Sequence, residues 1–179
     1  TKGADVIKLT RTAGAGNATF TLSNASLEFA GGNIKLSDGV DLVANTGNKA
    51  LTVLGVRGTS YEDVTLTTTG TLTVGTGGIG SGTQIEDVSL DGTSIVLQGD
   101  ITTAGATTAG GTNNVGDVDF DGAVTIDGAV TITTDVSEST VNDGKIDFAT
   151  NTINAEGSDT DSLTLTSGSG TITLGGAVG

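Results

Sequence analysis

The sequence predicts an all-β fold, a right-handed parallel β-helix (β-solenoid) with about 22 residues and three short strands in each coil. Three observations lead to this prediction. The composition is that of strands, a six-residue phrase recurs between Asp117 and Thr134, and three series of aliphatic residues keep step along the chain. We expect residues 1–179 to form a single solenoid segment of about seven to eight coils.

The composition favours short strands over a core built on large aromatic rings. The chain has 179 residues, with 30 glycines, no proline, cysteine, methionine or tryptophan, and 3% aromatic residues. Its hydrophobic residues, 35% of the total, are mostly valine, isoleucine, leucine and alanine. With abundant threonine, these residues suit a pleated surface. The strict patterning of the apolar residues argues for order, although a high net charge alone would favour disorder.

The phrase DVDFDG-AVTIDG-AVTITT, from Asp117 to Thr134, is predicted to form one coil. In each copy two apolar residues alternate with aspartate or threonine. Because successive side chains of a strand point to opposite faces, the apolar pair is expected inside and the polar residues outside. Gly122 and Gly128 separate the copies and allow the chain to bend, since glycine accepts a positive φ.

Three series of inward residues, one for each strand of a coil, are predicted to recur about every 22 residues. The first contains Phe20, Leu42, Val64, Val88, Val118, Val141 and Leu163. The second contains Leu27, Leu51, Leu72, Ile95, Val124, Ile146 and Ile172. The third contains Ile34, Val56, Ile79, Ile101, Val130 and Ile153. All three take one larger step at the same place, which predicts a single insertion loop over residues 103–116.

The two ends of the chain are predicted to be uncapped. Val6 and Leu9 are expected in the last strands of a preceding coil, and residues 161–179 supply two strands and a further one near Val178. No amphipathic helix covers either end, where a solenoid normally needs a cap. Open ends present unpaired backbone groups to another strand. Either the chain is part of a longer solenoid, or copies stack on its ends.

The irregular coils favour the right-handed form. Left-handed hexapeptide helices have uniform coils of about 18 residues. Only the coil from Asp117 to Thr134 fits that period, whereas the corners of the other coils vary in length. The general preference for right-handed crossovers points the same way.

The charge excludes two classes of partner. Net charge is −14, and the chain has only seven lysines and arginines. Binding to nucleic acid needs a basic surface, which this chain cannot build, so no nucleic-acid partner is expected. An anionic membrane surface would repel it, and no apolar run is long enough for membrane insertion.

No residue is predicted to be catalytic, to bind a cofactor or to serve as a dedicated metal ligand. The chain has no histidine and no cysteine, so Ser–His and Cys–His nucleophile pairs are excluded. The glycine-rich stretch 75–82 lacks the lysine and helix of a phosphate loop. A carbohydrate-active site needs paired carboxylates with basic residues and sugar-stacking rings, which are scarce here.

Calcium is the one cation for which the sequence offers a possible binding motif. Asp117-x-Asp119-x-Asp121-Gly122 resembles the start of an EF-hand loop. However, Val118 and Phe120 stand between the aspartates, and the twelfth position of the loop is Gly128 rather than glutamate. Aspartates on the outer face of a strand are therefore the favoured interpretation. Weak calcium binding between stacked carboxylates remains an alternative.

Paired threonines could form a flat outer face of the kind that binds ice. Such T-x-T pairs occur at Thr65/Thr67, Thr71/Thr73, Thr131/Thr133, Thr164/Thr166 and Thr171/Thr173. Threonine also suits the outer face of any strand. The pairs do not all share one predicted series, so we expect that they do not line up on one face.

Residues 116–135, GDVDFDGAVTIDGAVTITTD, and 161–179, DSLTLTSGSGTITLGGAVG, resemble the repeats of very large bacterial surface proteins of the filamentous haemagglutinin type. The resemblance covers most of the chain but is one of style and composition. It implies a right-handed β-helical rod, export from the cell, and a role in adhesion or in an extracellular fibre. The secretion signature of that family is not visible, and no site residue is carried over.

The leading hypothesis is a non-enzymatic structural segment of an extracellular or cell-surface filament or adhesin. Expected partners are further copies, joined head to tail into a fibre, and glycans or host and abiotic surfaces. One alternative is a ligand-binding β-solenoid module that recognises glycans, calcium or ice. A viral tail-fibre or surface-layer segment is a further alternative within the structural class.

Overall fold

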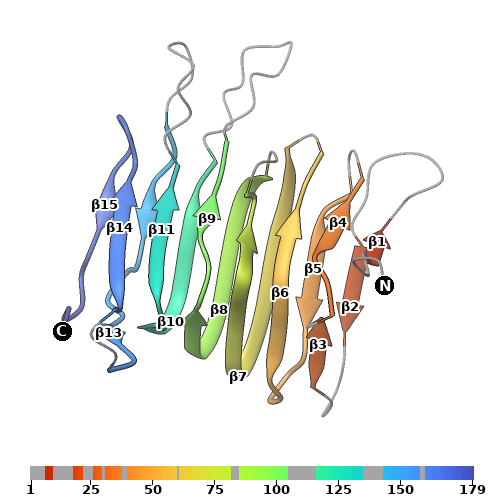
Figure 1. Cartoon of the computed structure of the whole chain (residues 1–179), viewed down its shortest axis with the longest axis horizontal. Coiled ribbons are helices and arrows are strands. Elements are labelled where there is room, and N and C mark those ends of the chain that lie inside the picture. Colours follow the sequence, from red (N-terminus) through yellow and green to blue (C-terminus); the bar gives the residue numbers. More distant parts are fainter. Residues whose placement is uncertain are drawn as a thin grey trace.

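The computed structural model describes residues 7–9, 18–21, 26–29, 31–37, 40–59, 61–81, 85–104, 116–134, 143–157 and 160–179. These residues form strands and corners and contain no helix, and therefore none that could span a membrane. The strands pair in parallel as one 15-stranded sheet that winds into stacked coils (Figure 1). The predicted all-β solenoid is confirmed at this level.

Three ladders of parallel strands build the walls of the solenoid. The first runs through β2 (Ala18–Thr21), β5 (Leu42–Asn45), β7 (Glu62–Ile79), β8 (Ile85–Leu97), β10 (Val118–Ile126), β12 (Ile146–Asp147) and β15 (Ile172–Thr173). The second runs through β3 (Leu27–Phe29), β6 (Leu51–Arg57), β7, β8, β10 and β13 (Ile153–Ala155), and ends at a bridge to Val178. The third runs through β1 (Ile7–Leu9), β4 (Ile34–Leu36), β6, β7, β9 (Ile101–Thr102), β11 (Ala129–Thr133) and β14 (Ser162–Thr166). Strands that turn a corner belong to more than one ladder.

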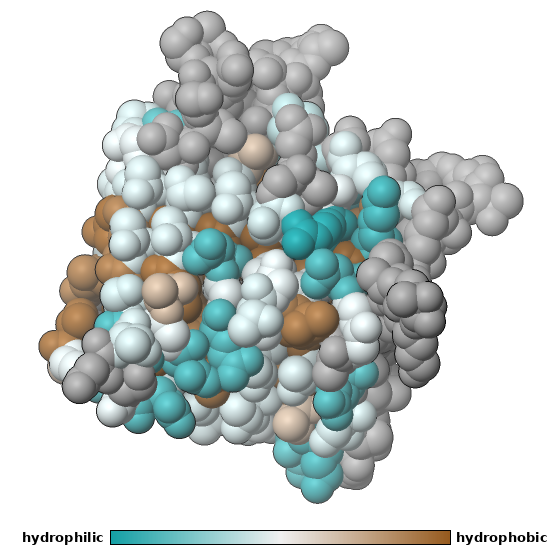
Figure 2. Space-filling model, in the orientation of Figure 1, coloured by the Kyte–Doolittle hydropathy of each residue, from teal (hydrophilic) through white to brown (hydrophobic). Residues whose placement is uncertain are grey.

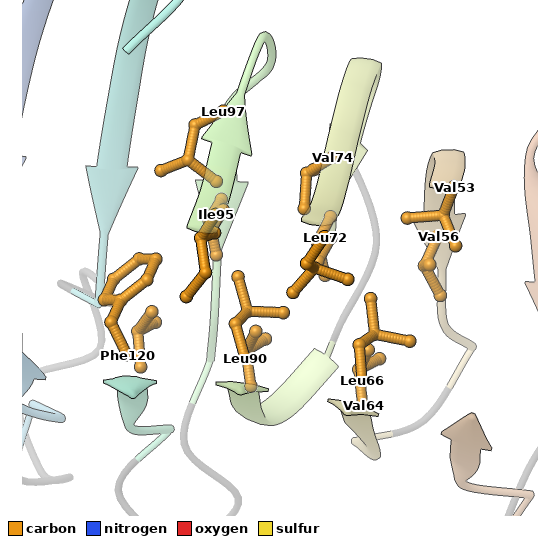
Figure 3. Close-up of a cluster of buried hydrophobic side chains, with 14 of the residues drawn as sticks. Val53, Val56, Val64, Leu66, Leu72, Val74, Leu90, Ile95, Leu97 and Phe120 are labelled. Carbon is orange, nitrogen blue, oxygen red and sulfur yellow. The ribbon is translucent and has the colours of Figure 1, made fainter. Parts of the chain in front are cut away.

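The core is a stack of aliphatic side chains inside the coils. In β10 the residues Val118, Phe120, Val124 and Ile126 are buried, and the residues between them are partly or fully exposed. Figure 3 shows the same inward side chains on successive coils pointing into one shared interior. The two-residue period of a strand therefore sets the core, as predicted.

Four consecutive members of each predicted series are confirmed. Adjacent members pair in register in the first, second and third ladders respectively: Leu42–Val64–Val88–Val118, Leu51–Leu72–Ile95–Val124 and Ile34–Val56–Ile79–Ile101. Leu27 also pairs with Leu51. Small offsets occur at two places: Leu42 pairs with Ala18 rather than Phe20, and Ile101 pairs with Ile132 rather than Val130. Val130 and Ile132 are both buried, so this shift of two residues leaves the same face inward, because the side-chain period is two.

The predicted series are wrong beyond β11. Ile146 and Ile172 lie in the first ladder, Ile153 in the second and Leu163 in the third. The physical reason is a second long connection, since the chain leaves β11 after Thr133 and reaches β12 only at Ile146. The sequence predicted one such connection, over residues 103–116, and residues 105–115 of it, between β9 and β10, lie outside the described residues. Val141 and Val6, also predicted as inward, fall outside the described residues.

Buried hydroxyl groups close the corner between the third and first ladders. The Thr134 Oγ1 donates to the carbonyl of Gly144 at 2.6 Å, and the Ser167 Oγ donates to that of Gly170 at 3.0 Å. Thr103 makes the equivalent bond to Gly116. Thr103 and Thr134 are fully buried, so each bond also satisfies a hydroxyl that has no access to water. The corner is thus fixed on both sides of each long connection.

Candidate functional site

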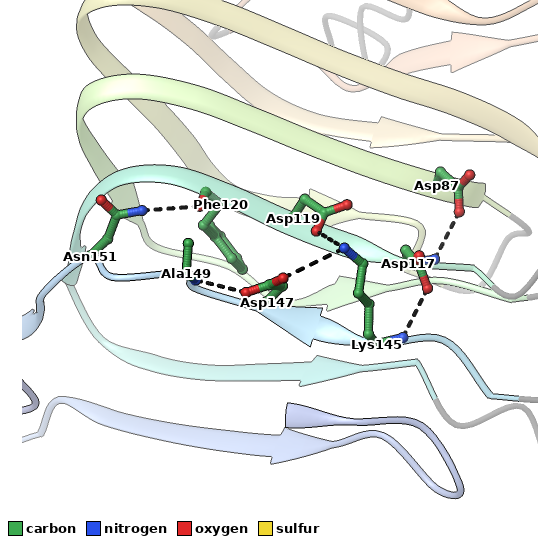
Figure 4. A network of polar contacts seen from close by, with 8 residues as sticks. All are labelled: Asp87, Asp117, Asp119, Phe120, Lys145, Asp147, Ala149 and Asn151. Atoms are coloured by element: carbon green, nitrogen blue, oxygen red, sulfur yellow. Dashed lines mark hydrogen bonds and ion pairs between the residues drawn. The ribbon is translucent and has the colours of Figure 1, made fainter. Parts of the chain in front are cut away.

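A column of aspartates, one on each of four successive coils, lies one residue before the first inward residue of the first ladder. In this aspartate column, Asp41, Asp63, Asp87 and Asp117, each carboxylate accepts a hydrogen bond from the next coil. The backbone N–H of Asp63, Asp87, Asp117 and Lys145 donates to the preceding aspartate at 3.0, 3.2, 2.8 and 2.9 Å. Figure 4 shows the last two of these bonds. The four bonds span 22, 24, 30 and 28 residues. The contact therefore persists although the coil length changes.

Lys145 takes the next place in the column and brings a positive charge. Its Nζ lies 2.6 Å from Asp119 Oδ1 and 3.6 Å from Asp147 Oδ2, and the other Asp147 oxygen accepts a bond from the Ala149 N–H at 2.7 Å (Figure 4). The hydrogen bond to Asp119 is the main reason that the Lys145 pKa is raised. All three charged side chains are partly exposed, so each pair adds at most about 1 kcal/mol to stability.

Burial and mutual repulsion act on the interior of the aspartate column. Partial burial is the largest cause of the raised pKa of Asp63 and Asp87. The charges of the neighbouring coils add to it: Asp41 and Asp87 for Asp63, and Asp117 and Asp119 for Asp87. Asp91, further along β8, has its pKa raised by burial and then by Asp121. The folded protein therefore holds protons on these carboxyls more tightly than the unfolded chain does.

We expect the thermal midpoint to rise as the pH falls from 7 towards the unfolded aspartate pKa of about 3.9. A carboxyl whose folded pKa is raised contributes stability that is complete below its unfolded pKa and is lost as the pH rises through its folded pKa. The expected gain at each site is below about 1 kcal/mol, because the groups are only partly buried. Differential scanning calorimetry between these pH values measures it.

The matched variant for the pH experiment is Asp63→Asn with Asp87→Asn. An amide oxygen still accepts the N–H bond from the next coil but carries no charge. The variant is expected to be more stable than the parent at pH 7 and to depend less on pH. A parent whose midpoint falls steadily on acidification would contradict the interpretation.

The aspartates around β10 lie on the outer side of that strand. No group of three or more described aspartates and glutamates is arranged to hold a metal ion. Asp117, Asp119 and Asp121 lie beside the buried Val118 and Phe120, on the outer side of β10 and its approach. Asp117 and Asp119 are already engaged by the Lys145 N–H and Nζ. The solvent-face interpretation of these aspartates agrees with their placement.

Two of the threonine pairs lie in register. Thr131 and Thr133 of β11 pair with Thr164 and Thr166 of β14, on the outer side of the third ladder. On the opposite edge of β11, Thr133 pairs with Thr102 of β9. The remaining pairs lie in the first and second ladders, as the differing series predicted. The threonine array, defined as these five residues, is thus confined to the last coils.

A basic column, made of Lys8, Lys35 and Arg57, lies in the third ladder near the N-terminal end of the solenoid. Lys8 pairs in register with Lys35, and Lys35 with Arg57. Lys35 is exposed, and Arg57 is partly exposed with its Nη1 donating to the Ser81 carbonyl. Neither Lys35 nor Arg57 forms an ion pair within the described residues, although the chain has 21 acidic residues. Lys35 and Arg57 therefore present their charge outward.

The last coil leaves apolar side chains uncovered. Ile172, Leu174 and Val178 occupy inward positions yet are 41%, 48% and 63% exposed. Figure 2 shows the corresponding apolar area at the β14–β15 end of the molecule. A hollow of about 110 Å³ opens beside it, lined by Ile126, Ile153, Asn154, Ala155, Asp161, Ser162, Leu163, Val178 and Gly179. The aliphatic stack is therefore open to solvent at this end.

The aspartate and basic columns were not predicted, although the sequence carries a signal for each. Asp41, Asp63, Asp87 and Asp117 each precede a member of the first series by one residue. Lys35 and Arg57 each follow a member of the third series. Aligning the outward residues on the inward series would have shown both columns.

The chain was compared with protein-family models, with curated proteins and with solved structures, and none of the three comparisons finds a match.

Proposed function

We propose that this chain is a non-enzymatic structural segment of an extracellular or cell-surface filament or adhesin, in which its coils continue those of a neighbouring copy. In this proposal the solenoid is a right-handed β-helix of about seven to eight coils, each of about 22 residues. The resemblance to repeats of the filamentous haemagglutinin type supports the extracellular assignment. The role is mechanical: a stiff spacer held by parallel hydrogen bonding and an aliphatic stack.

The exposed inward side chains of the last coil carry the proposal. Ile172, Leu174 and Val178 continue the buried stack but lack the coil that would cover them. The outer edge of β14 has no partner strand within the described residues. An edge of this kind is a template for another strand, and burying its apolar residues would drive the contact. Such a contact is heterologous and does not close, so it produces a fibre.

Sedimentation velocity and electron microscopy at increasing protein concentration test the proposal. We expect end-to-end oligomers whose length grows with concentration. Replacing Leu174 and Val178 with lysine should return the protein to monomers, because two charges would have to be buried at the junction. Ser89→Lys with Thr131→Lys is the matched control, since it adds the same charge at exposed positions of strands that are paired on both sides. A parent that stays monomeric at high concentration would rule the fibre out.

A second candidate function is recognition of an ordered surface by the threonine array. The register of Thr131 and Thr133 over Thr164 and Thr166 favours it, because the array repeats at the inter-strand spacing of about 4.8 Å. Inhibition of ice recrystallisation is the direct measurement, with ice as the ordered surface. Activity should fall when Thr131 and Thr164 are replaced by lysine. No inhibition by the parent protein would exclude the ice version.

A further inference from the structure

The surface of the solenoid separates its charges into two regions on different ladders. The basic column of Lys8, Lys35 and Arg57 follows the third ladder at the first coils. On the first ladder, Asp91 of β8 pairs in register with Asp121 of β10, several coils further along. Like charges placed directly opposite each other on adjacent strands are destabilising. Each region therefore carries a local cost that an opposite charge would relieve.

Neither region finds that opposite charge within the described part of the chain. Lys145 is the one described cation that forms ion pairs, and its partners are Asp119 and Asp147. Asp91 and Asp121 have no cationic partner among the described residues. The repulsion between them is visible in the raised pKa of Asp91, where Asp121 contributes after burial.

We infer that the basic column of one copy binds the Asp91–Asp121 pair of a second copy, so that solenoids associate side by side. The two surfaces carry opposite charges at equal spacing. Both columns are built on adjacent parallel strands, so both repeat at about 4.8 Å along the rod. Lys35 and Arg57 can therefore face Asp91 and Asp121 one to one, whichever way the two rods run.

The two surfaces lie on different ladders, so the contact is heterologous. Each copy offers its basic column to one neighbour and its acidic pair to another, which extends the row without closing it. Because the basic column lies nearer the N-terminal coils, the rods are staggered. The inference rests on the proposed structural role, but it concerns the sides of the rod, whereas that proposal concerns the ends.

Ionic strength separates this lateral contact from the end contact. At low salt, two copies repel each other at long range because each chain has a net charge of −14. At about 0.15 M salt the screening length is about 8 Å, so the net repulsion is reduced while close ion pairs persist. At about 1 M salt the length is about 3 Å and the pairs weaken. Lateral association should therefore peak near physiological salt, whereas apolar end contacts persist at high salt.

Charge exchange on the full chain provides the test, with the end contact blocked throughout by Leu174→Lys and Val178→Lys. Sedimentation velocity at about 0.15 M salt should show association of this background. Association should be lost in a variant with Lys35→Glu and Arg57→Glu, and also in one with Asp91→Lys and Asp121→Lys. An equimolar mixture of the two variants should associate again, because their altered surfaces complement each other. Lys49→Glu, an exposed substitution on another corner, is the control and should associate normally.

The outcomes separate the two proposals. If the end-blocked background stays monomeric at every salt concentration, or the mixture of charge variants fails to associate, the lateral contact is wrong. End-to-end growth of the parent protein would then still stand as a separate result. If association of the background is lost equally with Lys49→Glu, the effect is one of net charge and the specific pairing is also wrong. Carbodiimide coupling followed by mass spectrometry should link Lys35 to Asp91 or Asp121 between copies.

Discussion

Replacement of Gly122 with alanine is expected to lower the free energy of unfolding by about 4 kcal/mol, enough to unfold a marginal solenoid. Gly122 lies at the corner inside β10 with φ of 149°, which residues with a side chain rarely adopt. A Cβ built there would lie 1.7 Å from the Gly92 carbonyl oxygen of the preceding coil. That oxygen belongs to the backbone of a stacked coil, so it cannot move without separating the coils.

Substitutions at two other glycines distinguish the cost of backbone strain from the cost of a steric clash. Gly128 has a φ of 115° but no atom within 4 Å of the place that a Cβ would take, so Gly128→Ala should show the strain alone, about 1 to 3 kcal/mol. Gly31 has open space and no strained φ, so Gly31→Ala should be nearly neutral. Urea unfolding followed by circular dichroism measures all three variants. Equal loss in Gly122→Ala and Gly128→Ala would refute the proposed contact with Gly92.

Truncation of Phe148 to alanine is expected to cost about 3 to 5 kcal/mol. Phe148 is fully buried, and its ring stacks on Phe120 of the preceding coil with ring centroids 4.4 Å apart and planes parallel. Removing it would leave a cavity between two coils, because stacked strands cannot close the gap without losing their hydrogen bonds. The midpoint of thermal unfolding should fall accordingly.

The conservative variant Phe148→Leu tests the role of the ring. Leucine already occupies the same inward position on earlier coils, at Leu66 and Leu90. Phe148→Leu should therefore lose mainly the stacking term, about 0.5 to 1.5 kcal/mol. Leu174→Ala is the exposed comparison and should cost less than Phe148→Ala, since Leu174 is 48% exposed. If Leu174→Ala costs as much as Phe148→Ala, burial does not explain the effect.

The sequence predicted the fold class and most of the core because both follow from side-chain alternation. Leu42, Val64 and Val88 could be placed one above another from their spacing alone, and they pair in register. The phase was lost after β11, where the polar stretch after Thr134 was counted as part of a coil. The spacing of apolar residues does not show by itself whether a given residue belongs to a strand or to a connection.

The outer surface was harder to predict than the core. Asp63 and Asp87 appear in the sequence as ordinary solvent-facing residues, and only the stacked coils reveal that each carboxylate accepts the N–H of the next. The grouping of Lys35 with Arg57 likewise depends on register, which brings together residues that are far apart in the chain. The exposure of Ile172 and Val178 depends on which coil is last in the stack, which alternation does not encode.

The hydroxyl-closed corners suggest a use for this chain as a display scaffold. Thr103 and Thr134 each donate a hydrogen bond to a carbonyl at the other end of a connection, Thr103 to Gly116 and Thr134 to Gly144. The two connections differ in length. These hydrogen bonds and the parallel ladders fix the adjacent coils, whatever sequence joins the threonine to the glycine. Foreign peptides grafted between Thr134 and Gly144 should therefore be presented at a defined position on a rigid support, with neighbouring coils offering a second graft site between Thr103 and Gly116.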